Sequence, residues 1–221
     1  MFQGACATAA LALAGPFCAA AAEQTKIKPI RIKYLKNSDF YGKDGKFNAD
    51  HAKQAYFHMM KGFHYPIFER LKGKDMWVTD FGLGDFTRVG MGGIFWWNDK
   101  ANGYFGHEIY LLPGQMIVEH AHEQAGDVKP KMEAWQVRHG MIFNFSVGEP
   151  TNPLPVELPQ SQAKFITCQH CEIVKPGEVA SLKQPGAKHF MLAGPEGTIV
   201  TEYATYHDNA ALRFTNPGVK F

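Results

Sequence analysis

The feature that most constrains this chain is a pair of histidines, His120 and His122, separated by one residue. Residues two apart on a strand project to the same face, so both imidazoles are expected to point to one side of a sheet. Glu133 follows at the start of the next strand-like run, and His189 follows a Pro-Gly turn that precedes a further strand. We expect these three imidazoles and one carboxylate to converge inside a barrel.

This set of side chains has a chemistry that a metal ion can use. Three imidazoles and a carboxylate suit a borderline divalent ion, such as manganese, iron, cobalt, nickel or zinc, and leave coordination positions open. Open positions are typical of catalytic sites, because substrate or water can enter them. The sequence therefore predicts a metal site made by His120, His122, Glu133 and His189. The alternative is that the four are hydrogen-bonded barrel residues in a protein that has no metal.

Composition limits the classes of function. The chain has 221 residues, 45% of them hydrophobic, which is typical of a globular protein. A net charge of +2, without a dense basic run, gives no support for binding nucleic acid. Thirteen prolines and 22 glycines indicate many turns, as in an all-β domain. We predict a signal peptide followed by a single domain over residues 23–221.

The first 22 residues differ from the rest. Residues 1–22 contain no charged side chain and are rich in alanine. Their apolar stretch is too short to span a bilayer, and the small residues before Glu23 resemble a signal-peptide cleavage region. We therefore expect a periplasmic or secreted protein that is not bound to a membrane after the signal is removed. No lysine or arginine precedes the apolar stretch, and without a functional signal the protein would be cytoplasmic.

One helix and a series of strands are expected along the chain. Asn48 is a suitable N-cap for a helix over residues 49–62, in which apolar residues recur at steps of three and four. This apolar stripe is expected to pack against the outside of the barrel. Short apolar runs separated by turns predict strands at 76–81, 90–97, 108–112, 116–121, 134–137, 141–147, 163–167, 179–182, 189–192 and 198–204.

Two cysteines lie close together near the middle of the strand series. Cys168 and Cys171 are separated by two residues, and no second pair with this spacing follows. In an oxidising compartment they could form a disulfide of small loop size. We expect either this disulfide or two free thiols, and we assign the pair no function.

The spacing of the histidines and glycines resembles the two motifs of the cupin family. Gly114 and Gly140 bracket the first group of ligands, and Gly177 and a Pro185-Gly186 turn precede His189. Further segments resemble the D-lyxose isomerase family of cupin sugar isomerases, and they lie at residues 76–86, 112–116, 119–122, 131–140 and 202–214. Together they span most of the chain after residue 75. Residues 123–130 lengthen the loop after the His-x-His pair, and Tyr206 and His207 stand where smaller polar residues are expected.

The resemblance implies a fold, a reaction and a cofactor. The fold would be an all-β cupin jelly-roll barrel with the N-terminal helical segment packed outside, in a homodimer. The reaction would interconvert aldoses and ketoses, typically D-lyxose with D-xylulose and D-mannose with D-fructose, through a cis-enediol intermediate. The cofactor would be a divalent metal, first of all Mn²⁺, with Zn²⁺, Co²⁺ or Fe²⁺ as alternatives.

Such an isomerase needs a base that moves a proton between two carbons, and Glu202 is the first candidate. It lies in an otherwise apolar strand, where burying a carboxylate is unfavourable and is typical of a functional site. The alternative is that Glu202 faces solvent. Lys131 lies two residues before Glu133 and would share its face, where it could bond substrate oxygens or act as the catalytic acid; the alternative is a lysine exposed to water. Asp208 and Arg213 could bind substrate, and an ordinary surface ion pair explains them almost as well.

Other polar and aromatic residues receive secondary roles. Trp135, Phe190 and Phe214 could form apolar walls of the site, or simply belong to the core. Asp80 and Asp85 are expected to form turns. We do not expect His107 and His139 to take part in the site.

Three further functions are compatible with the same ligand set. A metal-dependent cupin lyase would act on a carboxylate substrate with Tyr203 or Tyr206 as base. A dioxygenase would need iron and consume oxygen. A non-catalytic periplasmic sugar-binding cupin would bind its ligand without turnover. The fold alone does not distinguish them.

Overall fold

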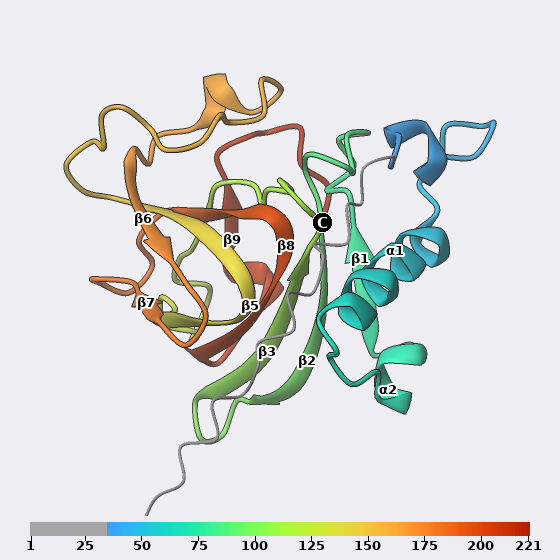
Figure 1. The fold of residues 1–221 in the computed structure, drawn as a ribbon. Helices are drawn as coiled ribbons and strands as arrows, with labels where there is room; N and C mark the ends of the chain where they lie inside the picture. Colours follow the sequence, from blue (N-terminus) through green and yellow to red (C-terminus); the bar gives the residue numbers. More distant parts are fainter. Residues whose placement is uncertain (1–34) are drawn as a thin grey trace, which may run out of the picture.

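The computed structural model describes residues 35–221, so the predicted signal peptide lies outside the described residues. These residues form a curled antiparallel sheet with a few short helices (Figure 1). The strands are β1 (Met76–Thr79), β2 (Met91–Asp99), β3 (Tyr104–Leu111), β4 (His120–His122), β5 (Glu133–Ser146), β6 (His170–Val174), β7 (Val179–Ser181), β8 (His189–Thr205) and β9 (Leu212–Phe214).

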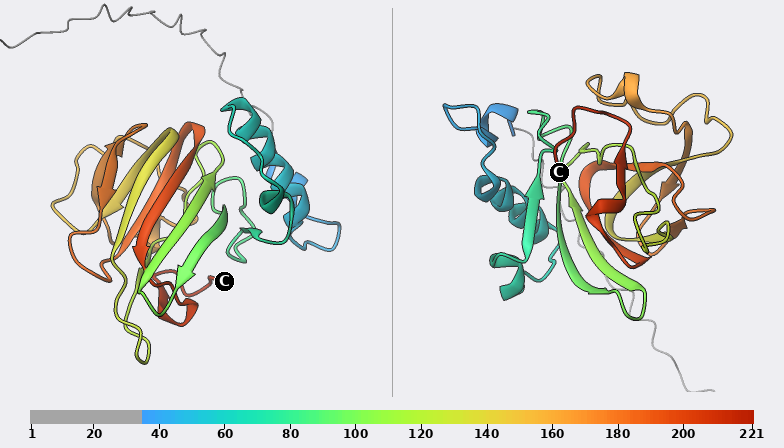
Figure 2. Two further views of the ribbon diagram at one scale, coloured as in Figure 1. Left: turned by 90° about the horizontal axis from the view of Figure 1, so that it is seen from below. Right: turned by 180° about the vertical axis from the view of Figure 1, so that it is seen from behind.

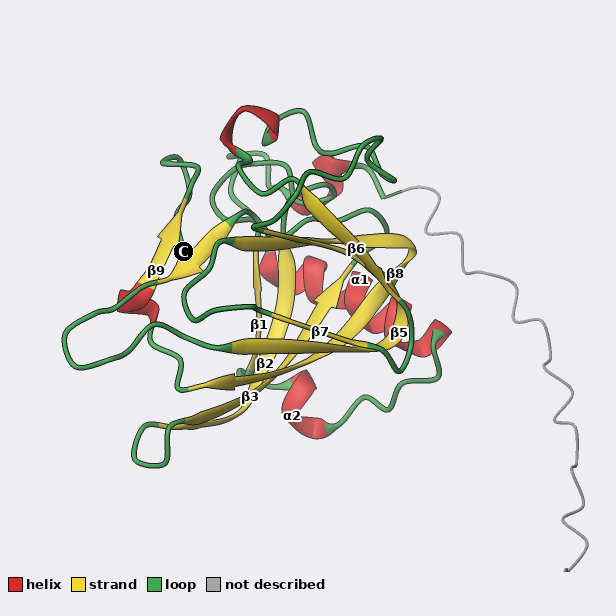
Figure 3. Cartoon of the chain, turned by 90° about the vertical axis from the view of Figure 1, so that its left-hand side faces the viewer, coloured by secondary structure: helices red, strands yellow, loops and turns green. Residues whose placement is uncertain are grey.

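The two longest strands, β5 and β8, hold the barrel together. They pair along most of their length, with irregularities in register near Val137 and Gly140. Beyond β8, the order β3, β2, β1 continues one wall, while β4 and β9 extend the other. β6 and β7 pair with β5, and the strands curl around a common interior (Figure 3). This architecture confirms the expected all-β cupin-type barrel.

Strand register brings distant parts of the sequence to one place. His120 on β4 pairs with His189 at the start of β8. Farther along β8, Glu202 stands opposite His107 on β3 and opposite Trp135 on β5. Because antiparallel partners point to the same face, these pairs direct imidazoles and carboxylates into one barrel interior.

The expected helix is present and lies outside the barrel. Helix α1 (Ala49–Gly62) begins after Asn48, whose side chain accepts a hydrogen bond from His51 N at 2.9 Å. Its buried face includes Tyr56 and Met60, and it packs on the outer surface of the sheet near β1 and β2 (Figure 2). Each large apolar side chain buried in this way contributes about 1.5–3 kcal/mol. A short helix α2 (Glu69–Lys72) follows.

Several strand predictions were wrong in detail. Residues 163–167 contain a 3₁₀ helix, η2 (Ala163–Phe165), while β6 and β9 were not predicted. The separate runs at 134–137 and 141–147 form one strand, β5, because Gly140 has a φ of +70° and lets the bent strand continue past an irregularity. Two further 3₁₀ turns, η1 (Asn37–Phe40) and η3 (Asn209–Ala211), lie near the two ends of the described chain.

The two cysteines of the described chain are free thiols, which agrees with one of the two expectations for Cys168 and Cys171. Cys168 is buried, and its Sγ donates a hydrogen bond to Lys188 O at 3.2 Å.

Among residues 35–221, no helix has both the length and the apolar character that crossing a bilayer requires.

Replacing Gly140 tests how closely β5 approaches its neighbour. A Cβ at this position would lie 1.9 Å from Gly197 O, in addition to the cost of a positive φ. We expect Gly140→Ala to lower the free energy of unfolding by more than about 3 kcal/mol. In the control, Gly103→Ala, φ is +72° but nothing lies within 4 Å, so the loss should be about 1–2 kcal/mol. Equal losses in urea denaturation would contradict the close approach.

Candidate active site

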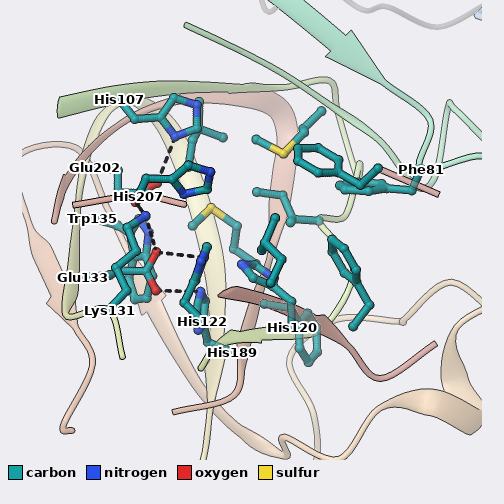
Figure 4. Close-up of a pocket in the computed structure, with 18 of the residues that line it drawn as sticks. Phe81, His107, His120, His122, Lys131, Glu133, Trp135, His189, Glu202 and His207 are labelled. Atoms are coloured by element: carbon teal, nitrogen blue, oxygen red, sulfur yellow. Dashed lines mark hydrogen bonds and ion pairs between the residues drawn. The ribbon is translucent and has the colours of Figure 1, made fainter. Parts of the chain in front are cut away.

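A pocket opens into the barrel interior and gathers most of the buried ionisable residues (Figure 4). The empty space within it, which includes solvent at its open mouth, is about 560 Å³. The polar residues that line it are His107, His120, His122, Lys131, Glu133, His189, Glu202 and His207. Aromatic and aliphatic side chains form the rest of the wall.

The three histidines predicted as metal ligands meet at one point, and Glu133 lies beside two of them. His120 and His122 come from β4, and the first residues of β8 and β5 supply His189 and Glu133. The ligand atoms of the three histidines lie within 4.8 Å of one another. Glu133 Oε1 is 3.4 Å from His122 Nε2, and Glu133 Oε2 is 3.4 Å from His189 Nε2. Two ligands at about 2.1 Å from one ion lie roughly 3.0–3.5 Å apart, so these spacings fit a shared ion.

The outer hydrogen bonds orient two of the imidazoles for this role. His120 Nδ1 donates to Val118 O, and His189 Nδ1 donates to Ala187 O, each at 2.9 Å. With the proton on Nδ1, the Nε2 lone pair is free to bind a metal. Glu133 Oε2 is buried and accepts no hydrogen bond from the described residues. The donor set and this open carboxylate oxygen therefore fit a divalent cation.

Burial also keeps these histidines neutral, which is the form that ligates metals. Loss of hydration lowers the pKa of His120 to about 3 and that of His189 to about 4. Loss of hydration likewise raises the pKa of Glu133 to about 8, although the Lys131 ammonium opposes this rise.

Lys131 connects the ligand group to the predicted base. Its Nζ donates to Glu133 Oε1 at 3.0 Å and to Glu202 Oε1 at 2.5 Å. Lys131 is 3% exposed and Glu202 is 4% exposed, so neither of them faces solvent. Burial alone would lower the pKa of Lys131, but the two carboxylates raise it. Burial alone would raise the pKa of Glu202, but Lys131 and His107 lower it, so both groups are charged.

The exclusion of His107 from the site was wrong. His107 lines the pocket, is 4% exposed, and its Nδ1 lies 2.9 Å from Glu202 Oε2. The motif spacing could not reveal it, because β3 lies outside both motifs and meets β8 only in the folded sheet. The available signal was the unusual histidine within the apolar run of β3. His139 lies outside the pocket, as expected, and its ring stacks on Phe63.

The structure does not bring Asp208 and Arg213 into the pocket. The Asp208 carboxylate accepts a hydrogen bond from Ala210 N at the start of η3, so it caps a turn. Arg213 is exposed, donates to Ala210 O, and has its Nε 3.8 Å from Glu123 Oε2. Arg213 points away from the pocket because it alternates along β9 with Leu212 and Phe214, which line it.

The remaining secondary predictions concern walls and turns. Trp135, Phe190 and Phe214 do line the pocket. Asp80 accepts hydrogen bonds from Gly82 N and Gly84 N, which is the turn role expected of it. His207 was noted only as a departure from the family pattern. It lines the pocket beside the ligand group, with its ring centroid 5.4 Å from that of His122.

Sequence comparison identifies the family. No protein-family model matches the chain. The D-lyxose/D-mannose isomerase of Thermosediminibacter oceani is 32% identical over 143 residues, which cover 65% of this chain and 77% of that protein. The D-lyxose ketol-isomerase of Cohnella laeviribosi is 33% identical over the same shares of the two chains. The chain belongs to the D-lyxose ketol-isomerase family. The resemblance indicated by the motifs is thereby confirmed.

Solved structures support the fold independently. The L-ribose isomerase of Acinetobacter sp. DL28, in complex with L-ribose, superposes with a TM-score of 0.59 at 15% identity, covering 77% of this chain and 92% of that one. The L-ribose isomerase of Cellulomonas parahominis gives a TM-score of 0.59 at 15% identity, covering 76% and 91%. At this identity the likeness concerns the fold alone, which is the cupin-type barrel.

Removal of one imidazole tests the ligand group. We expect His120→Ala to reduce bound divalent metal at least tenfold at limiting metal concentration, because losing one ligand weakens a site of this kind strongly. Metal content after dialysis, measured by mass spectrometry, reports the loss. His58→Ala, which removes a histidine on α1 far from the ligand group in the fold, is the control and should keep the metal. Stoichiometric metal in the His120 variant would overturn the ligand assignment.

Proposed function

We propose that this protein is a metal-dependent aldose–ketose isomerase that acts through a cis-enediol. The observation that carries the proposal is the buried chain of contacts from Glu133 through Lys131 to Glu202. This chain places the Glu202 carboxylate and the Lys131 ammonium beside the histidines and Glu133 that could hold a metal ion. Membership of the D-lyxose ketol-isomerase family supports the same reaction.

The chain's own residues supply the proton transfers. A divalent ion held by His120, His122, Glu133 and His189 would supply Lewis-acid polarisation of the substrate's carbonyl and neighbouring hydroxyl. Glu202 takes the proton from C2 of the open-chain aldose, and the electron pair of that C–H bond forms the C1–C2 double bond of the enediol. Glu202 then returns the proton to C1, which gives the ketose.

Lys131 transfers the protons of the two substrate oxygens, O1 and O2, in this scheme. Its ammonium lies between the two carboxylates and can donate a proton to O1 as the enediol forms, then regain one from O2. No net proton is gained or lost, which an isomerisation requires. The low exposure of Lys131 and Glu202 excludes bulk water from the transfer path.

A lyase with a tyrosine base is less well supported by the geometry. Tyr203 is 48% exposed and donates to Gln136 Oε1 on the outside of the sheet. Tyr206 lies near Lys100, and neither tyrosine lines the pocket. A tyrosine base is therefore absent from the described part of the pocket, whereas Glu202 is present. Turnover without oxygen consumption would exclude both a dioxygenase and a non-catalytic sugar-binding cupin.

The finer properties are part of the same proposal. The relatives' names make D-lyxose and D-mannose the first substrates to try, and we propose Mn²⁺ as the metal, with Zn²⁺, Co²⁺ and Fe²⁺ as alternatives. The alanine-rich residues 1–22 support export to the periplasm or the medium.

We also propose that the protein is a homodimer. Trp97 and Tyr203 are exposed and flank Gly106 on adjacent strands, so they form an apolar patch on the outer sheet face. Exposed aromatic groups of this kind are typical of protein interfaces. Sedimentation velocity should show a dimer, and Trp97→Lys with Tyr203→Lys should shift it to the monomer. A monomeric wild-type protein at micromolar concentration would contradict the proposal.

Replacement of the base tests the reaction directly. We expect Glu202→Gln to keep its metal and to lose at least about 10³-fold in kcat, because the amide cannot accept the carbon-bound proton. Conversion of D-lyxose to D-xylulose, followed by NMR, provides the measurement. Glu172→Gln changes an exposed carboxylate on β6 and should leave kcat unchanged. Full activity of the Glu202 variant would show that another group is the base.

A further inference from the structure

Both oxygens of Glu202 are held by side chains from different parts of the sheet. Lys131 holds Oε1 at 2.5 Å. His107, which stands opposite Glu202 in the register of β3 and β8, holds Oε2 at 2.9 Å. The last torsion of a glutamate side chain is soft, so the direction of its carboxylate depends on such contacts. In Figure 4 the His107 contact lies on the far side of Glu202 from the ligand group.

Gly93 on β2 has no side chain, and the His107 ring occupies the space that a side chain would fill. A Cβ built on Gly93 would lie 2.4 Å from His107 Nε2 and 2.7 Å from Trp77 Cζ2. The Trp77 indole stacks on the imidazole, with ring centroids 5.6 Å apart and an interplanar angle of 25°. The absence of a side chain at Gly93 is therefore required for the His107 imidazole to lie this close to β2. Trp77 and Gly93 together fix the orientation of that ring.

The contacts of the two ring nitrogens determine which one carries the proton. Nδ1 faces the Glu202 carboxylate, while Nε2 faces Gly93 and finds no hydrogen-bond partner in the described chain. We assign the proton to Nδ1, which donates to Glu202. Burial lowers the pKa of His107, which agrees with a neutral ring.

We propose that His107 is a positioning residue that holds the Glu202 carboxylate in the direction from which it moves the proton between C1 and C2. The inference rests on the proposed isomerase function. Without the Nδ1 donor, Oε2 is free to turn toward Lys131 or toward the ligand group. The carboxylate then loses its alignment with the reacting carbons, which lowers the rate of chemistry and leaves substrate binding unchanged.

Two substitutions separate the donor from the shape of the ring. His107→Phe keeps a planar ring and removes the donor, and we expect kcat to fall about 10–100-fold with KM and metal content unchanged. His107→Asn keeps a nitrogen donor near the position of Nδ1, and we expect kcat within about fivefold of the wild type. A purely structural role for the ring predicts the opposite order, with Phe the milder change.

A second pair of variants tests the position of the His107 ring without altering the histidine itself. Gly93→Ala would displace the imidazole, because the added Cβ would lie 2.4 Å from Nε2; the contact of Nδ1 with Glu202 would then be disturbed, and kcat should fall as in His107→Phe. Gly92→Ala is the matched control, because its Cβ would meet Tyr56 Cε2 at 3.0 Å in the cluster under α1, not His107. We expect it to lower stability only, with kcat unchanged.

Nitrogen-15 NMR of the histidine side chains provides a readout that does not depend on turnover. The His107 ring should be neutral with its proton on Nδ1, and Glu202→Gln should shift that Nδ1 signal. An Nε2-protonated ring in the wild type would overturn the inference.

The kinetic outcomes distinguish this inference from the function on which it rests. An inactive metal-loaded wild type would refute the proposed isomerase. An active wild type with full kcat in folded His107→Phe would refute only the positioning role. Equal losses in folded His107→Phe and His107→Asn would refute it as well, because the donor would then be irrelevant.

Discussion

The buried ammonium of Lys131 is the contact on which the rest of the site depends. Glu133 and Glu202 are both buried, and two carboxylates side by side repel each other and lose hydration. Lys131 bonds to both, and its ammonium balances the charge of the Glu202 carboxylate. Burial raises the pKa of Glu133 to about 8, so a divalent cation among the three histidines and Glu133 would displace a proton from that carboxyl on binding.

The fold stabilises this charge cluster by fixing its members from several strands at once. β4 supplies two imidazoles, the first residues of β5 and β8 supply Glu133 and His189, and a later part of β8 supplies Glu202. The register between β3 and β8 adds His107 behind Glu202. Because each side chain is attached to a strand that pairs with its neighbours, small movements are resisted by the whole sheet. A proton transfer that depends on alignment needs such rigidity.

The sequence predicted the parts of this site that lie within short motifs. The spacing of His120 and His122, with Glu133 and His189, was enough because strand periodicity and turn residues are local properties. The helix after Asn48 was predicted for the same reason. His107 was missed because its role comes from the register of β3 and β8, which no local pattern encodes. Asp208 and Arg213 were candidates for substrate binding, but a turn cap and an outward strand position direct them elsewhere.

Proton NMR in deuterated water, with D-lyxose and with D-mannose, tests the central claim most directly. The metal-loaded protein should convert the aldose to its ketose, with deuterium entering the transferred position to the extent that the base exchanges with solvent. The same protein stripped of metal should do neither, and added Mn²⁺ should restore conversion. Confirmed metal binding without conversion or exchange would contradict the account. Conversion at full rate by the metal-free protein would contradict it equally.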